Sequence, residues 1–460
     1  MSFPAYAAYK DSGVDWLGEL PEHWQALALS RVLATPVTDG PHTTPEFLDD
    51  GVPFLSVDGI QDGKLYFEGC RYVSFEDHKE FSKKAAPKYN DLLMGKAASI
   101  GKIARVTENI EFSIWSPLAL IRVNEEQCSP EFLEFCLKSS ELQHQVLLAS
   151  NSNTQLNIGM KDIPKLKIPL PAVQEQTQIA RFLDHETARI DALIEEQQRL
   201  IELLNQKRQA LISRAVTRGL EPMVPMKKSG VEWLGEVPAH WDVKALRYLG
   251  ECQNGINIGG EAFGSGSPFV SYGDVHKNDV LPTEVTGLVQ SSPEDRQRYS
   301  IEYGDVFFTR TSETVDEIGF SATCLQKLKN AVFAGFLIRF RPTGNSLTPG
   351  FSKYYFRNQR LRIFFNKEMN LVTRASLSQD LLKQLPVTLP PVIEQIKISD
   401  FLDKVTAEFA SLLEQGRLSI DLLIERRSAL ISAAVTGKID VRGWQPSARV
   451  PSPELELEAV

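Results

Sequence analysis

The chain has 460 residues, 42% of them hydrophobic and 24% charged, which is typical of a soluble globular protein with several domains. The net charge of −9 argues against nonspecific coating of nucleic acids or acidic membranes, although it permits a local basic surface. No apolar segment approaches the roughly 20 residues that cross a bilayer, and the N-terminus lacks the pattern of a signal peptide. We therefore expect a cytoplasmic protein with no membrane partner.

A phrase near the N-terminus occurs twice. SGVDWLGELPEHW at residues 12–24 returns as SGVEWLGEVPAHW at residues 229–241, and both of its tryptophans are separated from their counterparts by the same length of chain. A repeat this long corresponds to a whole domain rather than to a solenoid unit. We assign residues 1–24 to an N-terminal frame segment and residues 220–241 to a central frame segment, and we expect their tryptophans to be packing residues.

Each frame segment is followed by a diverged stretch, at residues 25–169 and at residues 242–388. Both stretches contain short apolar runs broken by Gly, Pro, Asn and Asp, such as VPFLSV from Val52 and DVFFTR from Asp305. Such runs predict strands of a compact sheet. The fold class we expect is therefore mixed α/β, with two globular domains.

Two long helices are predicted, at residues 170–219 and 389–437. Their apolar positions advance in steps of three or four with the same phase, which is the spacing of a coiled coil, and each segment follows proline and ends at glycine. Matched residues of the two helices, such as Leu183 and Leu402, have one constant separation along the chain, which we call the frame offset. Two successive steps of four at Gln197 and at Gly416 indicate a stutter.

The arrangement of the two helices follows from the duplication. Because similar halves associate around a pseudo-twofold axis, we expect the helices to be antiparallel. The residues we assign to the helix pair and its partner-docking surface are Glu175, Leu183, Ile190, Leu204, Glu394, Leu402, Phe409 and Leu423.

The C-terminal residues 438–460 belong to neither copy of the repeat. The end of this stretch, QPSARVPSPELELEAV, is rich in proline and acidic residues. That composition predicts a disordered tail.

The motifs of catalytic sites fail their spacing tests. GKAASIGK at residues 95–102 resembles a phosphate-binding loop, but its glycines are six apart instead of five and Ile103 replaces the required Ser or Thr. The five cysteines form no C-x-x-C pair and the seven histidines form no H-x-x-x-H pair. We therefore expect no catalytic site, no metal site and no bound cofactor.

The ordered duplication of SGVxWLGxxPxHW, LPxxxEQ, FLD and a helix ending near TG resembles the specificity (S) subunit of Type I restriction-modification enzymes, over essentially the whole chain. This resemblance implies a noncatalytic subunit with two target recognition domains, each of which reads one half of a bipartite site in double-stranded DNA. It also implies that the helices set the spacing and dock two modification (methyltransferase) subunits, with restriction/translocase subunits in the full complex. S-adenosylmethionine is then expected on the modification subunits.

Candidate DNA contacts are Arg, Lys, Asn and Thr side chains in predicted loops, because these groups suit phosphates and base edges. The candidates are Thr43, Lys102, Asn153, Asn257, Arg310 and Arg374. Lys102, Asn153, Arg310 and Arg374 are preferred because their loops are expected to correspond between the copies. Two alternatives stay open: the recognition subunit of a Type IIB or Type IIG system, and a protein-interaction scaffold that does not bind DNA.

Overall fold

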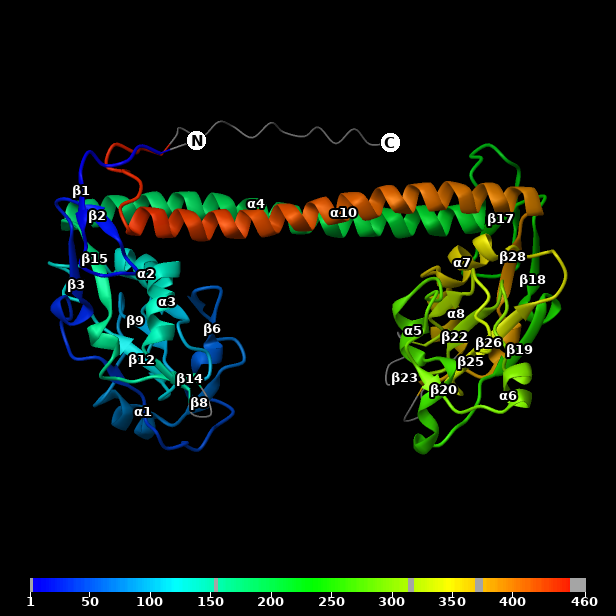
Figure 1. Cartoon of the computed structure of the whole chain (residues 1–460), viewed down its shortest axis with the longest axis horizontal. Coiled ribbons are helices and arrows are strands. Elements are labelled where there is room, and N and C mark those ends of the chain that lie inside the picture. Colours follow the sequence, from blue (N-terminus) through cyan, green and yellow to red (C-terminus); the bar gives the residue numbers. More distant parts are fainter. Residues whose placement is uncertain (1–2, 153–155, 313–317, 369–374, 447–460) are drawn as a thin grey trace. The chain divides into compact units, whose positions relative to one another are not determined.

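The computed structural model describes residues 3–152, 156–312, 318–368 and 375–446. These residues form two compact units (Figure 1), of which unit 1 comprises residues 1–197 and 418–460 and unit 2 comprises residues 198–417. Each long helix therefore contributes one part to each unit, and the boundaries fall at Gln197 and beside Gly416, where the sequence predicts a stutter. Among the described residues, no helix is both long and apolar enough to span a membrane.

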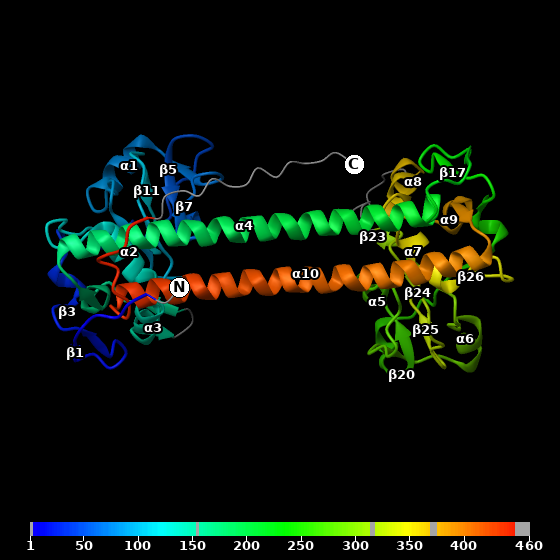
Figure 2. The same cartoon turned by 90° about the horizontal axis from the view of Figure 1, so that it is seen from above.

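The predicted long helices are α4 (Val173–Arg218) and α10 (Val392–Val435). In both units a stretch of one runs alongside a stretch of the other (Figure 2). In unit 1, Arg427 Nε lies 3.2 Å from Asp191 Oδ1. In unit 2, a Cβ atom at Gly416 would lie 3.0 Å from Ile201 Cγ1, so glycine permits a close approach of the two helices.

The direction of the two helices can be read from their ends in unit 2. The end of α4 lies beside the start of α10, because a Cβ atom at Gly219 would lie 3.2 Å from Glu394 Oε1. The predicted antiparallel pairing is confirmed there.

The apolar runs of unit 1 form strands as predicted, but these strands are divided between two small sheets, beside several two-stranded pairs, instead of forming one compact sheet. A four-stranded antiparallel sheet has the order β10-β9-β12-β4, and a three-stranded sheet has the order β11-β5-β8. The central strands β9 and β12 are buried along their whole length, so their runs are continuously apolar. The strands of unit 1 are β1 (Tyr9–Asp11), β2 (Glu19–Pro21), β3 (Gln25–Ala28), β4 (Thr38–Asp39), β5 (Val52–Leu55), β6 (Ile60–Gln61), β7 (Lys64–Leu65), β8 (Arg71–Val73), β9 (Leu92–Gly95), β10 (Ile103–Arg105), β11 (Ser113–Ile114), β12 (Leu118–Ile121), β13 (Ser150–Ser152), β14 (Leu156–Ile158) and β15 (Lys167–Leu170). Its short helices are α1 (Phe75–Ser82), α2 (Pro130–Lys138) and α3 (Ser140–Leu148).

The globular domain of unit 2 repeats this plan. Its four-stranded sheet has the order β19-β26-β22-β24, and its three-stranded sheet has the order β21-β20-β25. The parallel pair β5 and β11 of unit 1 corresponds to the parallel pair β20 and β25 of unit 2. The strands of unit 2 are β16 (Met226–Lys228), β17 (Glu236–Pro238), β18 (Asp242–Ala245), β19 (Gly250–Asn254), β20 (Phe263–Val270), β21 (Leu288–Val289), β22 (Val306–Thr309), β23 (Thr311–Ser312), β24 (Ser321–Thr323), β25 (Val332–Phe333), β26 (Leu337–Pro342), β27 (Ala375–Ser376) and β28 (Pro386–Leu389). Its short helices are α5 (Tyr272–Lys277), α6 (Pro293–Arg298), α7 (Pro349–Arg357), α8 (Leu361–Glu368) and α9 (Gln379–Gln384).

A buried glutamine joins the globular domain to the long helix in each unit. In unit 1, Gln176 Oε1 accepts a hydrogen bond from Ser129 N at 2.8 Å, and Gln176 Nε2 donates to the carbonyl oxygens of Gln127 and Pro171. In unit 2, Gln395 makes the same three bonds to the residues one frame offset later, namely Thr348, Ser346 and Pro390. The duplicated EQ of the sequence is thus a structural connection.

The frame tryptophans pack internally, as predicted. Trp24 and Trp241 are fully buried in the cores of units 1 and 2. Each ring lies against the glycine that ends a long helix, because a Cβ atom would lie 3.3 Å from Trp24 at Gly437 and 3.2 Å from Trp241 at Gly219. Both glycines have positive φ, the usual conformation just after a helix.

The first part of the predicted disordered tail is packed against unit 1. Val441 is buried, and the ring of Trp444 lies 5.3 Å from that of Phe182 in an edge-on arrangement. Gln178 Nε2 also donates to the carbonyl oxygens of Val441 and Trp444. The disorder prediction is therefore wrong for residues 438–446, because it weighed proline and acidic content and overlooked these apolar side chains. Residues 447–460 lie outside the described residues.

Candidate nucleic-acid interface

Matching strands define equivalent loops in the two globular domains. Strand β9 is followed by Lys96 and strand β22 by Arg310. Lys96 N donates to Pro117 O, and Arg310 N donates to Phe336 O, both at 2.9 Å. On the other side, Lys96 O accepts from Ile158 N at 2.9 Å.

Arg310 O makes the corresponding bond, because it accepts from Leu377 N at 2.7 Å and Leu377 lies one frame offset after Ile158. Lys96 and Arg310 therefore occupy the same place in the two folds. The expected correspondence between Lys102 and Arg310 is wrong. Lys102 directly precedes β10, and its Nζ donates to Ile60 O at 2.9 Å.

Lys96 is not among the candidates selected from the sequence. The match was hidden because the stretches that precede these strands differ in length, so that Arg310 comes earlier in its copy than the frame offset predicts. The ends of the buried runs LLMG and VFFT mark the correct alignment.

A second pair of equivalent loops follows β4 and β19. Gly40 and Gly255 begin these loops, and a Cβ atom at either would lie within 2.3 Å of a backbone carbonyl oxygen, so only glycine fits. Two residues further on, His42 occupies the place that Asn257 has in unit 2. Thr43 is exposed on the loop after His42.

In unit 2, two of the predicted residues lie beside Gly335. Arg310 Nη1 lies 3.5 Å from Gly335 O, and a Cβ atom at Gly335 would lie 1.9 Å from Asn257 Oδ1. The Nε atom of Arg310 is buried and has no hydrogen-bond partner in the part of the chain that the structure describes. The neighbouring Phe336 is 62% exposed. This cluster presents an amide, a guanidinium and an aromatic ring, three groups that contact bases and phosphates in nucleic-acid complexes.

In unit 1, the same place holds cations around a buried carboxylate. Asp39 is 4% exposed, and its Oδ2 lies 3.0 Å from Lys96 Nζ and 3.2 Å from His42 Nε2. Lys84 also donates to Asp39 Oδ1. Burial alone would raise the pKa of Asp39, but the hydrogen bonds from Lys84 and Lys96 outweigh burial and lower this pKa. A stably ionised Asp39 thus positions Lys96.

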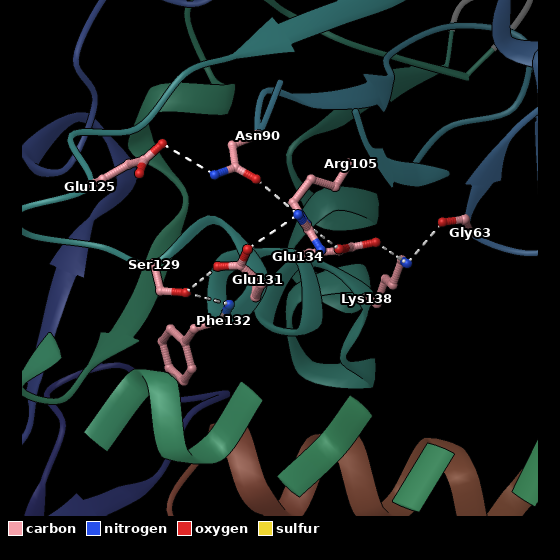
Figure 3. Close-up of polar contacts among 9 residues, drawn as sticks. All are labelled: Gly63, Asn90, Arg105, Glu125, Ser129, Glu131, Phe132, Glu134 and Lys138. Atoms are coloured by element: carbon pink, nitrogen blue, oxygen red, sulfur yellow. Dashed lines mark hydrogen bonds and ion pairs between the residues drawn. The ribbon is translucent and has the colours of Figure 1, made fainter. Parts of the chain in front are cut away.

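Arg105, the last residue of β10, makes its polar contacts inside unit 1 (Figure 3). Its guanidinium contacts Glu134 at 3.0 Å, Glu131 at 3.2 Å and Asn90 Oδ1 at 2.9 Å. Lys138 donates to Glu134 Oε1 at 2.5 Å and so extends this network. The network holds α2 against β10 and leaves Arg105 engaged in ion pairs.

Asn153 and Arg374, the other two preferred candidates, lie outside the described residues. Among the described residues nearby, Asn157 forms a bridge with Ala97 after β9, and Ser376 pairs with Thr311 after β22.

The residues assigned to the helix pair have two kinds of environment. Leu183, Ile190, Leu402 and Phe409 are buried, whereas Leu204 and Leu423 are half-buried. Glu175 Oε2 lies 2.9 Å from His23 Nε2 and Glu394 Oε2 lies 2.8 Å from His240 Nε2, so each glutamate contacts its own frame segment.

Other leucines and isoleucines of the long helices are left exposed. Those between 46% and 57% exposed on these helices are Leu193, Leu200, Leu203, Ile396, Leu412, Leu418, Leu422 and Ile424. Exposed apolar side chains at this density on a helix pair are typical of a protein-binding surface.

Comparison with known proteins identifies the family. The model described as "Type I restriction modification DNA specificity domain" matches residues 37–204 and again residues 240–420. The chain is 26% identical over 452 residues to the Type I restriction enzyme EcoKI specificity subunit of Escherichia coli K12, with 95% of this chain and 93% of that protein covered. It is 23% identical over 447 residues to the StySPI specificity subunit of Salmonella potsdam, with the same coverage.

Two solved structures share the fold. One comes from a study of complex assembly and conformational transition of the type I R-M system, with a TM-score of 0.69, 16% identity and coverage of 90% of this chain and 98% of that chain. The other is the HsdS subunit of Thermoanaerobacter tengcongensis, with a TM-score of 0.54, 18% identity and coverage of 91% and 98%. With two matches of the family model along its length, the chain belongs to the family of Type I restriction-modification DNA specificity subunits.

Proposed function

We propose that the globular domain of each unit reads one half of a bipartite target in double-stranded DNA. This proposal rests on one observation: the two globular domains share a fold but have different residues at equivalent loop positions. Lys96 stands where Arg310 does, and His42 stands where Asn257 does. Because an amide suits adenine whereas a guanidinium or an ammonium suits guanine, the presence of His42 where unit 2 has Asn257 suits the two domains to different half-sites.

The long helices are proposed to dock two modification subunits and to set the separation of the half-sites. The exposed leucines of α4 and α10 support the docking role, because a helix pair that met only solvent would place polar residues there. Glu175, Leu183, Ile190, Leu204 and their counterparts in α10 stay predictions for this role. Restriction/translocase subunits would join the assembled complex.

The chain itself is proposed to be noncatalytic, with S-adenosylmethionine bound by the modification subunits. The failed spacing of GKAASIGK supports this proposal. The purified chain should show no methyl transfer, DNA cleavage or ATP hydrolysis when it is incubated with S-adenosylmethionine, ATP and DNA. If any of these three activities co-purified with the chain, the result would contradict the proposal.

Genome-wide detection of methylated adenine, in cells with and without the gene for this chain, tests the recognition function. A bipartite motif with two separated half-sites should lose its methylation when the gene is deleted. If the lost motif is bipartite and the DNA is also cleaved at fixed distances on both sides of it, the result would favour a Type IIB-like system. An unchanged methylation pattern would favour the scaffold alternative.

Insertion of four residues after Gln197 tests the spacing role. This insertion lengthens α4 by about 6 Å and keeps its apolar face close to register, whereas two residues would rotate the face by about 200°. The four-residue variant should recognise the same half-sites with a spacer altered by about one or two base pairs, and the two-residue variant should fail to assemble. An unchanged spacer at full activity would contradict the spacing role.

A further inference from the structure

Four arginines of unit 2 line two adjoining depressions where the last turns of α4 meet the start of α8. The larger depression has a volume of about 680 Å³, and Arg214, Arg218 and Arg360 are among its lining residues. Its remaining lining consists of amide, hydroxyl and apolar side chains and includes no carboxylate. The second depression is lined by Arg208, and we call these four residues the arginine surface.

The charges of the arginine surface are not neutralised within the described residues. None of the four guanidinium groups has a hydrogen bond or an ion pair there, and the Nε atom of Arg208 is buried without a partner. The carboxylate that lines the second depression, Glu202, accepts a hydrogen bond from Gln206 at 3.2 Å. Because a guanidinium stays protonated, this surface keeps its positive charge at any physiological pH.

Unit 1 neutralises the position that matches Arg208. The match is Arg427, one frame offset later, and its Nε lies 3.2 Å from Asp191 Oδ1 on the neighbouring helix. The residue that matches Asp191 in unit 2 is Ala410. Unit 2 therefore keeps the cation and lacks the carboxylate.

Unit 1 also differs at the position that matches Arg360. This position holds Glu141, which forms an ion pair with Lys438 at 3.1 Å. The preceding residue, Ser140, is hydrogen-bonded to Ser432 at 2.7 Å, so α3 is fixed to α10. A carboxylate in unit 1 is thus replaced by a cation in unit 2.

The arginine surface is held in place by a buried asparagine. Asn358 is 2% exposed, and its Oδ1 accepts from Ser213 Oγ at 2.6 Å and from Arg360 N at 3.0 Å. These bonds fix the turn before α8 to α4. Arg214 and Arg218 lie four residues apart, which is about 6 Å along the helix, so their charges suit a row of anions better than a single anion.

We propose that the arginine surface binds phosphate groups of the DNA backbone beside the half-site read by unit 2. Guanidinium groups bind phosphates through two parallel hydrogen bonds, and amide and hydroxyl side chains such as Gln206, Gln209 and Ser213 are common additional donors to phosphates. This inference rests on the proposed function, because DNA is the polyanion that this function brings to the chain. It adds an anchor in unit 2 that unit 1 lacks.

Salt-dependent DNA binding tests the inference. The full chain, alone and assembled with modification subunits, is titrated with a fluorescent duplex of about 40 base pairs at several salt concentrations. The variant R214Q/R218Q/R360Q should bind about tenfold more weakly at low salt. Its slope of log affinity against log salt concentration should be smaller by about 2 to 3, because each lost phosphate contact removes about 0.9.

Two further variants serve as controls. The variant R247Q/K277Q/K329Q removes the same number of positive charges from exposed positions of unit 2 and should keep the original slope. The variant R214K/R218K/R360K retains the charges and should recover most of the slope. Circular dichroism and thermal unfolding establish that each variant is folded.

An unchanged slope for the folded glutamine variant would overturn the inference, while DNA binding by the unaltered chain would leave the proposed function standing. Loss of modification-subunit binding with unchanged DNA binding would also overturn it, in favour of an acidic protein partner. If neither the unaltered chain nor its complex bound the duplex, the inference and the proposed function would fall together.

Discussion

In unit 1, Gln176 joins the globular domain to α4 through three hydrogen bonds, and in unit 2 its counterpart Gln395 makes the same three bonds to α10. The charged groups of the two units differ, since Asp39 contacts two lysines and a histidine in unit 1 whereas Asn254 stands at its place in unit 2. The connections within the frame have therefore been kept through the divergence of the copies. The charges at the loops have changed, as expected if both copies meet the same protein partners but different DNA sequences.

The largest expected difference between the units is the loss of stability when two matched phenylalanines are replaced by alanine. Phe182 is fully buried under Trp444, whereas Phe401 is 39% exposed. Phe182→Ala should lower the free energy of unfolding of unit 1 by about 4 kcal/mol, because it leaves a cavity in a packed core. Phe401→Ala should cost unit 2 about 1 kcal/mol, because less apolar surface is lost from the core. Urea unfolding with hydrogen exchange resolved by peptide measures both values, and equal costs would contradict the asymmetric packing.

The buried glutamines should behave alike. Gln176→Leu and Gln395→Leu each leave one backbone N–H and two carbonyl oxygens without a partner, at about 1 kcal/mol or more for each group. Each variant should therefore destabilise its own unit by about 3 kcal/mol, with a difference between the two of less than about 1 kcal/mol. The same exchange experiment measures this difference, and a loss confined to one variant would show that the frames are not equivalent.

Asp39→Asn should destabilise unit 1 by about 2 kcal/mol at neutral pH, because it removes the partner of the buried Lys96 and of the exposed Lys84. The pKa of Asp39 is lower in the folded state than in the unfolded state, so its contribution is fully present above the unfolded pKa of about 3.9 and is lost as the pH falls through the folded pKa. The stability difference from the unaltered chain should therefore shrink below about pH 4. Denaturant unfolding across pH 7 to 3 measures it, with Asn254→Ala as the pH-independent control in unit 2. A difference that stayed constant over this range would argue against an ionised Asp39.

The smallest expected effect on stability comes from introducing into unit 2 a carboxylate that unit 1 has at the matching position. Ala410→Asp should give Arg208 the partner that Arg427 has in Asp191, and should raise the stability of unit 2 by about 0.5 kcal/mol at low salt. The gain should disappear at about 1 M salt because exposed ion pairs are screened. Thermal unfolding at both salt concentrations measures the gain, and an increase that persisted at high salt would point to a cause other than an ion pair.

Much of the fold could be predicted from the sequence, because the helix seam and the duplicated phrases obey simple spacing rules. Leu183, Ile190, Leu402 and Phe409 are buried as their spacing predicts. The candidate interface was harder to predict, because its residues are brought together by loops of different length in the two copies. Lys96 was therefore passed over in favour of Lys102.

The packed part of the tail was missed for a related reason. Composition averages over a segment, whereas Val441 and Trp444 each find a specific apolar site on unit 1. The identical hydrogen bonds of the buried glutamines could not be anticipated either, since a Gln in the first turn of a helix is ordinarily solvated. Only their repetition as EQ in both copies hinted at a shared role.

The most direct measurement of the central claim is the methylation motif of a chimera in which residues 25–169 are replaced by the corresponding domain of another specificity subunit. One half-site should change while the other half-site and the spacer persist, because unit 2 keeps its own loops and both frames are unaltered. Circular dichroism and co-purification with the modification subunits would show that the chimera is folded and assembled. A change in both half-sites of such a chimera would contradict the claim that each unit reads its own half of the target.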